Sequence, residues 1–264
     1  MTTTETRRHN PIAPALPELT PQAEVALLAR MLFREGYDDH LAGHITYKQP
    51  DDTLLVNPFG LTWDEVKASD VMRIDLDGNV LDGPWTVTPA ISLHLELHRA
   101  RHDVTVAVHN HPRWATIYAD LGRAPAVYDQ TSALVAGDVA VYADYEGPVN
   151  QTENARAAVE AMGDASMALL QNHGVLVVGR DIPQAYLRAA TIEWRARQAW
   201  HVEAVGGGKA LPAEVHEGFG RIFDQVNFPG LFEAMARREL REDPGILDLN
   251  PPLSAGFTAA RPNG

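Results

Sequence analysis

Three histidines stand where their side chains could share one metal ion. His109 and His111 lie in the run Val-Ala-Val-His-Asn-His-Pro, which closes an apolar stretch, and His173 follows another such stretch in Leu-Leu-Gln-Asn-His-Gly. Side chains alternate along a strand, so His109 and His111 project from one face, and the end of a neighbouring strand can bring His173 beside them. Three imidazoles fill most of a tetrahedral zinc site and leave one position open, as in catalytic sites. The pattern predicts an enzyme that uses a divalent metal, zinc first, with iron, manganese or cobalt as alternatives.

A second group of histidines has helical spacing. His94, His98 and His102 are four residues apart, which places them on one face of a helix. In a zincin helix the glutamate directly follows the first histidine, whereas Glu96 stands two residues along and faces elsewhere. We therefore interpret these residues as polar positions beside the core stripe of the helix, without a separate metal, and note that His94 could approach the three-histidine site from behind its ligands.

The composition excludes several classes of protein. The chain has 264 residues, a formal charge of −13 and 45% hydrophobic residues, which is enough to bury a substantial core. The negative charge argues against nucleic acid, because binding to phosphates needs clustered Lys and Arg. No apolar run approaches the length of a membrane span, and the N-terminus lacks the apolar segment of a signal peptide. Since the chain has no cysteine, thiolate ligands and disulfides are excluded. We expect a cytoplasmic protein that acts on a small molecule, without nucleic acid or membrane partners.

The elements that must position the histidines follow from the periodicity. Helical spacing is predicted after Thr20 up to about Gly36 and over 91–100, 112–121, 153–162, 182–205 and 213–240. Hairpins are predicted over 45–57 and 72–81, a short helix at the capping box Thr62 to Glu65, and buried strands over 104–108, 168–171 and 174–178. Charged stretches 34–39 and 237–242 are interpreted as solvated helix faces. The expected organisation is a disordered arm (1–18), one domain (19–241) and an extended or disordered tail (242–264).

With these motifs assembled, the chain resembles the class II aldolase/adducin family. The resemblance runs from about residue 20 to 205, in this order: Ala-Gly-His-Ile-Thr (42–46), Val-Asn-Pro-Phe-Gly-Leu (56–61), the acidic turn region 69–80, Ser-Leu-His (92–94), His-Asn-His-Pro (109–112) and Leu-Leu-Gln-Asn-His-Gly-Val (169–175). It implies a three-layer α/β/α fold around a mainly antiparallel sheet. It also implies a divalent metal on His109, His111 and His173, and a homotetramer with sites at subunit interfaces.

The departures from the family pattern bear on the substrate. The catalytic glutamate of the sugar-phosphate aldolases falls at Ala90, and the phosphate-binding loops become Gly43-His44, the run 57–60 and Thr88-Pro89. A non-phosphorylated substrate is therefore expected, bound by loop residues in this set: Gly43, His44, Asn57, Gly60 and Thr88.

The expected reaction is cleavage of a carbon–carbon bond in a small hydroxy- or oxo-carbonyl compound. A metal-bound carbonyl stabilises the charge left by bond cleavage. Decarboxylation needs only that electron sink and one proton donor, so the loss of the glutamate weighs more against an aldolase than against a decarboxylase. His44 and Tyr128, the latter supplied by a neighbouring subunit, are the candidate proton donors. Two alternatives stay open: an Fe(II) oxygenase on the same three histidines, and a non-catalytic adducin-like scaffold.

Overall fold

One eight-stranded sheet organises the part of the chain that the computed structural model describes, residues 14–135, 137, 139–143 and 151–249. The strand order is β4-β3-β2-β1-β5-β8-β7-β6. Neighbouring strands pair antiparallel, except that β6 and β7 are parallel. The strands are β1 His44–Lys48, β2 Leu54–Val56, β3 Met72–Ile74, β4 Val80–Asp82, β5 Val106–Asn110, β6 Val139–Tyr142, β7 Met167–Leu170 and β8 Gly174–Gly179.

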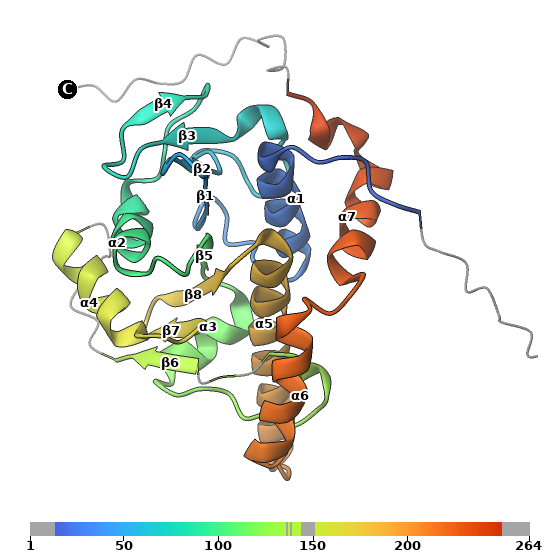
Figure 1. Ribbon diagram of the computed structural model, residues 1–264. Helices are drawn as coiled ribbons and strands as arrows, with labels where there is room; N and C mark the ends of the chain where they lie inside the picture. Colours follow the sequence, from blue (N-terminus) through green and yellow to red (C-terminus); the bar gives the residue numbers. More distant parts are fainter. Residues whose placement is uncertain (1–13, 136, 138, 144–150, 250–264) are drawn as a thin grey trace, which may run out of the picture.

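Helices cover both faces of this sheet (Figure 1). The described α-helices are α1 Pro21–Arg34, α2 Ser92–Ala100, α3 Arg113–Asp120, α4 Thr152–Met162, α5 Ile182–Ala204, α6 Ala213–Gln225 and α7 Leu231–Glu242. None of the helices in the described ranges is both long and apolar enough to cross a membrane.

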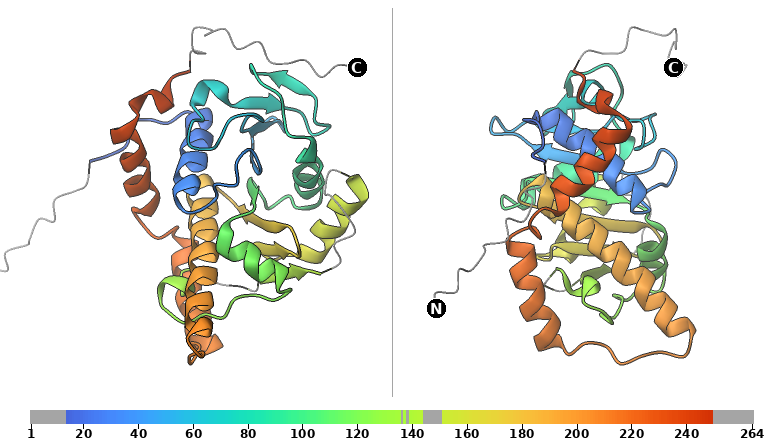
Figure 2. Two further views of the ribbon diagram at one scale, coloured as in Figure 1. Left: turned by 180° about the vertical axis from the view of Figure 1, so that it is seen from behind. Right: turned by 90° about the vertical axis from the view of Figure 1, so that its right-hand side faces the viewer.

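The layers follow from the alternation of side chains along the central strands. In β8, Val175 and Val177 join the core beneath α1, α3 and α5, whereas Leu176 and Val178 join the core beneath α2 and α4. Helix α7 packs on α1 and α5, and α6 extends along α5 beyond the sheet (Figure 2). The expected three-layer α/β/α fold around a mainly antiparallel sheet is confirmed.

Helix α1 shows why the predicted elements form where they do. Thr20 caps it, since its side-chain oxygen accepts a hydrogen bond from the backbone N–H of Ala23 at 3.2 Å, and Pro21 occupies the first turn. Leu28 and Met31 lie on the buried face and are fully covered. Burial of such a side chain contributes about 1.5–3 kcal/mol. The helix therefore anchors the loop that follows it, which reaches the three-histidine site.

The registers of β1, β5 and β8 bring distant segments to one end of the sheet. His44 lies opposite His109, and Asn110 lies opposite Val175. The carboxyl end of β5 therefore meets the amino ends of both β1 and β8. The candidate site is built at this junction.

Several expectations differ from the structure. Strand β6 was not anticipated. The capping box at Thr62 makes its hydrogen bond to Glu65 at 2.9 Å, but the chain there forms a turn and no helix, because Trp63 packs into the core on Tyr37. The beginning of the expected tail is ordered, with a 3-10 helix at Pro244–Leu247; the rest of the tail and most of the arm, 1–13, lie outside the described residues.

Candidate metal centre

The imidazoles of His109, His111 and His173 come together at the end of β5. His109 is the penultimate residue of β5, His111 follows the strand, and His173 lies in the turn between β7 and β8. One ring nitrogen from each lies within 4.8 Å of the other two. The ring centroids are 4.7 to 5.3 Å apart. The convergence that a shared metal requires is therefore present, and this is the one such group of three found among the described residues.

Hydrogen bonds fix which nitrogen faces the centre. Nδ1 of His109 donates to the carbonyl of Val175 at 2.8 Å, and Nδ1 of His111 lies 2.8 Å from Oδ2 of Asp39. A neutral imidazole has one N–H, so both rings present a bare Nε2. Nε2 of His111 is buried and has no hydrogen-bond partner in the described protein. A buried nitrogen lone pair without a donor fits a metal ligand, and a carboxylate behind a histidine is typical of such sites.

The electrostatic setting keeps the imidazoles of His109 and His173 neutral. Burial lowers the pKa of His109 well below its ordinary value, and burial together with His111 lowers the pKa of His173 to about 4. Only the neutral ring has a lone pair to give to a metal, so this environment favours metal binding at neutral pH.

Two glycines allow the backbone to approach the ligands closely. A Cβ on Gly174 would come within 2.6 Å of Cδ2 of His111 and would meet the carbonyl of Asn110. Gly43 has φ +90°, and a Cβ there would overlap the side chain of Asn110, whose amide donates to the carbonyl of Ala42 at 3.2 Å. Glycine is required at both positions by close packing around the end of β5.

His44, the predicted proton donor, lies beside this centre. It begins β1, is fully buried, and its ring centroid is 5.0 Å from that of His109. Nε2 of His44 donates to the carbonyl of Ala90 at 3.0 Å, and Ala90 is the position at which the family resemblance predicts a glutamate in the sugar-phosphate aldolases. Burial lowers the pKa of His44 to about 3. A neutral imidazole therefore lies beside the backbone of Ala90.

The other predicted substrate-binding residues have local structural partners. Oδ1 of Asn57 accepts the backbone N–H of Ile45 at 2.7 Å, and the side-chain oxygen of Thr88 accepts that of Ala90 at 3.2 Å. Gly60 has φ +103° in the exposed turn after Asn57. These contacts hold the backbone at the start of β1, where His44 lies, and at Ala90.

Tyr128 is not brought to the three histidines by any contact within this chain. Its half-buried ring packs near Gly208, beyond the end of α5. A role for Tyr128 at the metal centre thus requires the neighbouring subunit that the sequence analysis invoked.

Sequence reasoning missed Asp39. The stretch 34–39 was interpreted as a solvated helix face, but helix α1 ends at Arg34 and the following loop delivers the Asp39 carboxylate to His111. No sequence pattern indicates this hydrogen bond, because Asp39 and His111 are 72 positions apart. The same interpretation was wrong for Glu239 in the stretch 237–242, which is buried and pairs with Arg34 at 2.6 Å.

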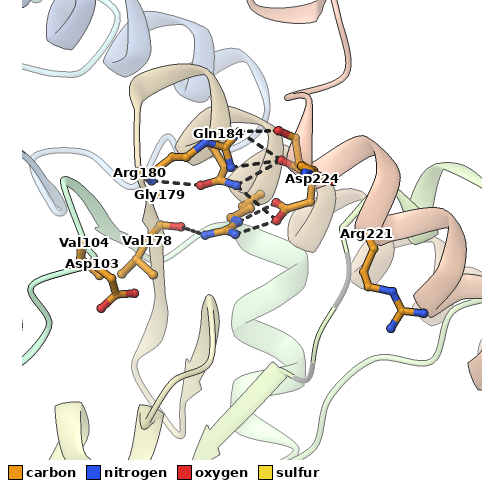
Figure 3. Close-up of a pocket in the computed structure, with 10 residues that line it drawn as sticks. Asp103, Val104, Val178, Gly179, Arg180, Gln184, Arg221 and Asp224 are labelled. Atoms are coloured by element: carbon orange, nitrogen blue, oxygen red, sulfur yellow. Dashed lines mark hydrogen bonds and ion pairs between the residues drawn. The ribbon is translucent and has the colours of Figure 1, made fainter.

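The pocket shown in Figure 3 is separate from the histidines. It has a volume of about 330 Å³ and lies at the Gly179 end of β8, opposite the end that begins beside His173. Its polar groups are largely satisfied by one another: Gln184 donates to the backbone carbonyl of Asp224 at 3.1 Å, and Arg188 pairs with the Asp224 carboxylate at 2.7 Å. These contacts hold α6 on α5.

Comparison with known proteins relates this fold and site to a family. The family model of the Class II Aldolase and Adducin N-terminal domain matches residues 23–200. The chain is 30% identical to the 5-deoxy-D-ribulose 1-phosphate aldolase of Bacillus thuringiensis, over 76% of this chain and 94% of that protein. It is 35% identical to the 3,4-dihydroxyphthalate decarboxylase of Arthrobacter keyseri, over 71% of this chain and 81% of that protein.

A solved structure extends the comparison to the fold. The L-fuculose 1-phosphate aldolase of Glaciozyma antarctica superposes with a TM-score of 0.77 at 22% identity, over 88% of this chain and 96% of that one. The matched region contains every residue of the candidate centre. The chain therefore belongs to the class II aldolase and adducin family, whose aldolase and decarboxylase members are metal-dependent lyases.

Proposed function

We propose that this protein is a metal-dependent carbon–carbon lyase, an aldolase or a decarboxylase, that acts on a small, non-phosphorylated hydroxy- or oxo-carbonyl compound. The observation that carries the proposal is the convergence of three imidazoles, with ligand nitrogens within 4.8 Å and a buried Nε2 on His111 that has no hydrogen-bond partner in the described protein. A closed structural site would have a fourth protein ligand. The relatives named as an aldolase and a decarboxylase support the same class of reaction.

His109, His111 and His173 would hold the metal, with zinc as the expected ion. When bound, the cation would polarise the substrate carbonyl and stabilise the negative charge left by cleavage of the adjacent carbon–carbon bond. Asp39 fixes the ring of His111 for this task, and the carbonyl of Val175 fixes that of His109. The ring of His109 is buried, and those of His111 and His173 are half-buried.

His44 is the residue that we propose to move the proton. Its Nε2 proton is held by the carbonyl of Ala90, so the neutral ring has its lone pair on Nδ1, which is buried and has no hydrogen-bond partner in the described protein. Such a nitrogen can take a hydroxyl proton from a substrate and return it to carbon. A strongly lowered pKa makes the protonated ring a strong acid, which suits return of the proton to a carbanion.

Substrate recognition is assigned to the loops around His44. Gly43, Asn57, Gly60 and Thr88 would shape the pocket mouth, and Tyr128 of a neighbouring subunit would complete it in a homotetramer. These loops lack the side chains with which the family binds phosphate, which supports a non-phosphorylated substrate.

The test begins with metal content. Anaerobically purified protein should contain one equivalent of a divalent metal, and His109→Ala should lose it, whereas His102→Ala, an exposed histidine of the same chain, should keep it. A panel of hydroxy- and oxo-acids is then screened for release of CO2 or aldehyde. Absence of metal from the unmodified protein would support a scaffold. Turnover that stops without O2 in iron-loaded protein would identify an oxygenase and refute the lyase.

A further inference from the structure

Helix α5 holds the two segments that bring Asp39 and His111 together. It packs on both α1 and α3. Asp39 lies in the loop after α1, and His111 lies just before α3. Their hydrogen bond, 2.8 Å between Oδ2 of Asp39 and Nδ1 of His111, therefore depends on where α5 places the loop and the helix.

The loop is fixed to α5 on both sides of a glycine. The hydroxyl of Tyr186 donates to Oε1 of Glu35 at 2.9 Å. The hydroxyl of Tyr37 donates to the carbonyl of Ala189 at 2.9 Å. Both tyrosine rings are buried, and Gly36 lies between the two anchored loop residues. The backbone of the loop is therefore held against α5 at Gly36.

Glu193, one turn further along α5, contacts both the loop and α3. Gly36 has φ +99°, and a Cβ there would lie 3.3 Å from Oε1 of Glu193, closer than an ordinary contact. The same oxygen accepts the backbone N–H of Trp114 at 3.0 Å, and Oε2 accepts that of Ala115 at 2.8 Å. These N–H groups belong to the first turn of α3, three and four residues after His111. The carboxylate thus bridges the loop after α1 and the start of α3.

Capping of α3 alone would not need this carboxylate. Pro112 precedes the helix and has no side-chain acceptor, whereas Ser, Thr, Asp or Asn at that position could cap the helix from within its own segment. The acceptor comes instead from a residue 78 and 79 positions away, and Glu193 is only 4% exposed. Burial of a carboxylate costs free energy and raises the pKa of Glu193 to about 7. An acceptor on α5 fixes where α3 lies relative to α5 and the loop, which a local cap does not do.

We propose that Glu193 is a positioning residue for the metal centre, which sets the hydrogen bond between Asp39 and His111 by holding the two segments that carry them. This inference rests on the proposed function, because the hydrogen bond orients a ligand of the proposed metal. Glu193 acts through the backbone on either side of it. Its effect should therefore appear at His111 and not at His109, whose Nδ1 is held by the carbonyl of Val175 through the pairing of β5 and β8.

The first measurement is zinc affinity, by competition with a chelator at pH 8, where the Glu193 carboxyl group is ionised. Glu193→Gln keeps the shape of the side chain but sets an amide NH2 against one of the two backbone N–H groups. Loss of a group behind a metal ligand lowers affinity about 10- to 100-fold, and a variant that displaces Asp39 without removing it belongs at the lower end, about tenfold.

The second measurement needs no metal. NMR of metal-free, full-length, 15N-labelled protein gives the ratio of the Nδ1–H and Nε2–H tautomers of each histidine. The hydrogen bond that a ring makes sets its tautomer, so the Asp39 carboxylate selects the Nδ1–H form of His111. We expect Glu193→Gln to lower this ratio in His111 by about tenfold, in step with zinc affinity, and to leave it unchanged in His109.

Two further variants make the test specific. Glu96→Gln is the matched control, since Glu96 is a buried carboxylate that pairs with Arg99 and Arg156 on the opposite face of the sheet. Gly36→Ala acts on the bridge from the side of the loop, because its methyl group would meet Oε1 of Glu193. It should change His111 as Glu193→Gln does, and it takes the place of that variant if Glu193→Gln does not fold.

The outcomes separate this inference from the proposed function. Unchanged zinc affinity together with an unchanged tautomer ratio of His111 would overturn the positioning role. An equal change in His109, or in the Glu96→Gln control, would also overturn it, because general loosening of the fold then accounts for the effect. Zinc absent from the unmodified protein contradicts the proposed function, whereas the tautomer ratio of the metal-free protein still decides the role of Glu193.

Discussion

Asp39 offers the sharpest test of how the metal centre is held. Its Oδ2 lies 2.8 Å from Nδ1 of His111, and its side chain is 38% exposed. Removal of a hydrogen-bonded group behind a metal ligand lowers metal affinity by about 10- to 100-fold, or about 1.4–2.7 kcal/mol. Because water can partly replace a carboxylate that is this exposed, we expect about tenfold for Asp39→Asn, which keeps an acceptor, and a loss closer to 100-fold for Asp39→Ala.

The assay is competition for zinc against a chromophoric chelator, with the metal-free protein as the starting point. Asp38→Asn is the control, since it removes one negative charge from the neighbouring position without a contact to His111. Similar zinc affinity in Asp39→Ala and the unmodified protein would refute the reasoning that this carboxylate orients the ligand. An equal loss in Asp38→Asn would show that net charge, and not the hydrogen bond, is responsible.

Further expectations concern single residues. His173→Ala should abolish stoichiometric zinc binding while circular dichroism stays unchanged; retained zinc would exclude His173 as a ligand. His44→Asn should keep zinc and lose turnover by about 10²–10⁴-fold in the CO2 or aldehyde assay. Gly174→Ala should lower the unfolding free energy by about 1–3 kcal/mol in urea, because the added methyl meets the backbone of Asn110. Burial raises the pKa of Glu193 from 4.5 to about 7. The folded protein therefore loses stability as the pH rises from about 4.5 through 7, because the buried carboxyl group must then ionise. Glu193→Gln should reduce this loss by up to about 3 kcal/mol, measured by urea titrations from pH 4.5 to 8.

Most helices and strands could be predicted because patterns within their own segments mark them. The cap at Thr20 and the apolar stripe after it set the start of α1, and the Asp77-Gly78 turn set the hairpin of β3 and β4. Strand β6 was missed because Val139–Tyr142 is short and is held as a strand by parallel pairing with β7. Tertiary packing of Trp63 overrode a local helix signal.

The candidate site also contains some residues that local patterns mark and others that they do not. The spacing of His109 and His111 at the end of one apolar run is a local signal, and the apolar run that precedes His173 indicated the third position. Asp39 and the contacts of Thr46 with His94 and His98 depend on register and on how α2 lies across β1. Such partners can be found only once the sheet order is known, because nothing within their own segments marks them.

The ligands of the centre come from the end of β5 and from the turn between β7 and β8, which are separated in the chain but adjacent in the sheet. A metal ion bound to all three histidines would link these two segments near the middle of the sheet. Metal binding should therefore raise the melting temperature. The free energy of unfolding should increase by about 2.7 kcal/mol when the free ion is at 100 times its Kd. Ranking candidate ions by the melting shift each produces offers a route to the native metal before any substrate is in hand.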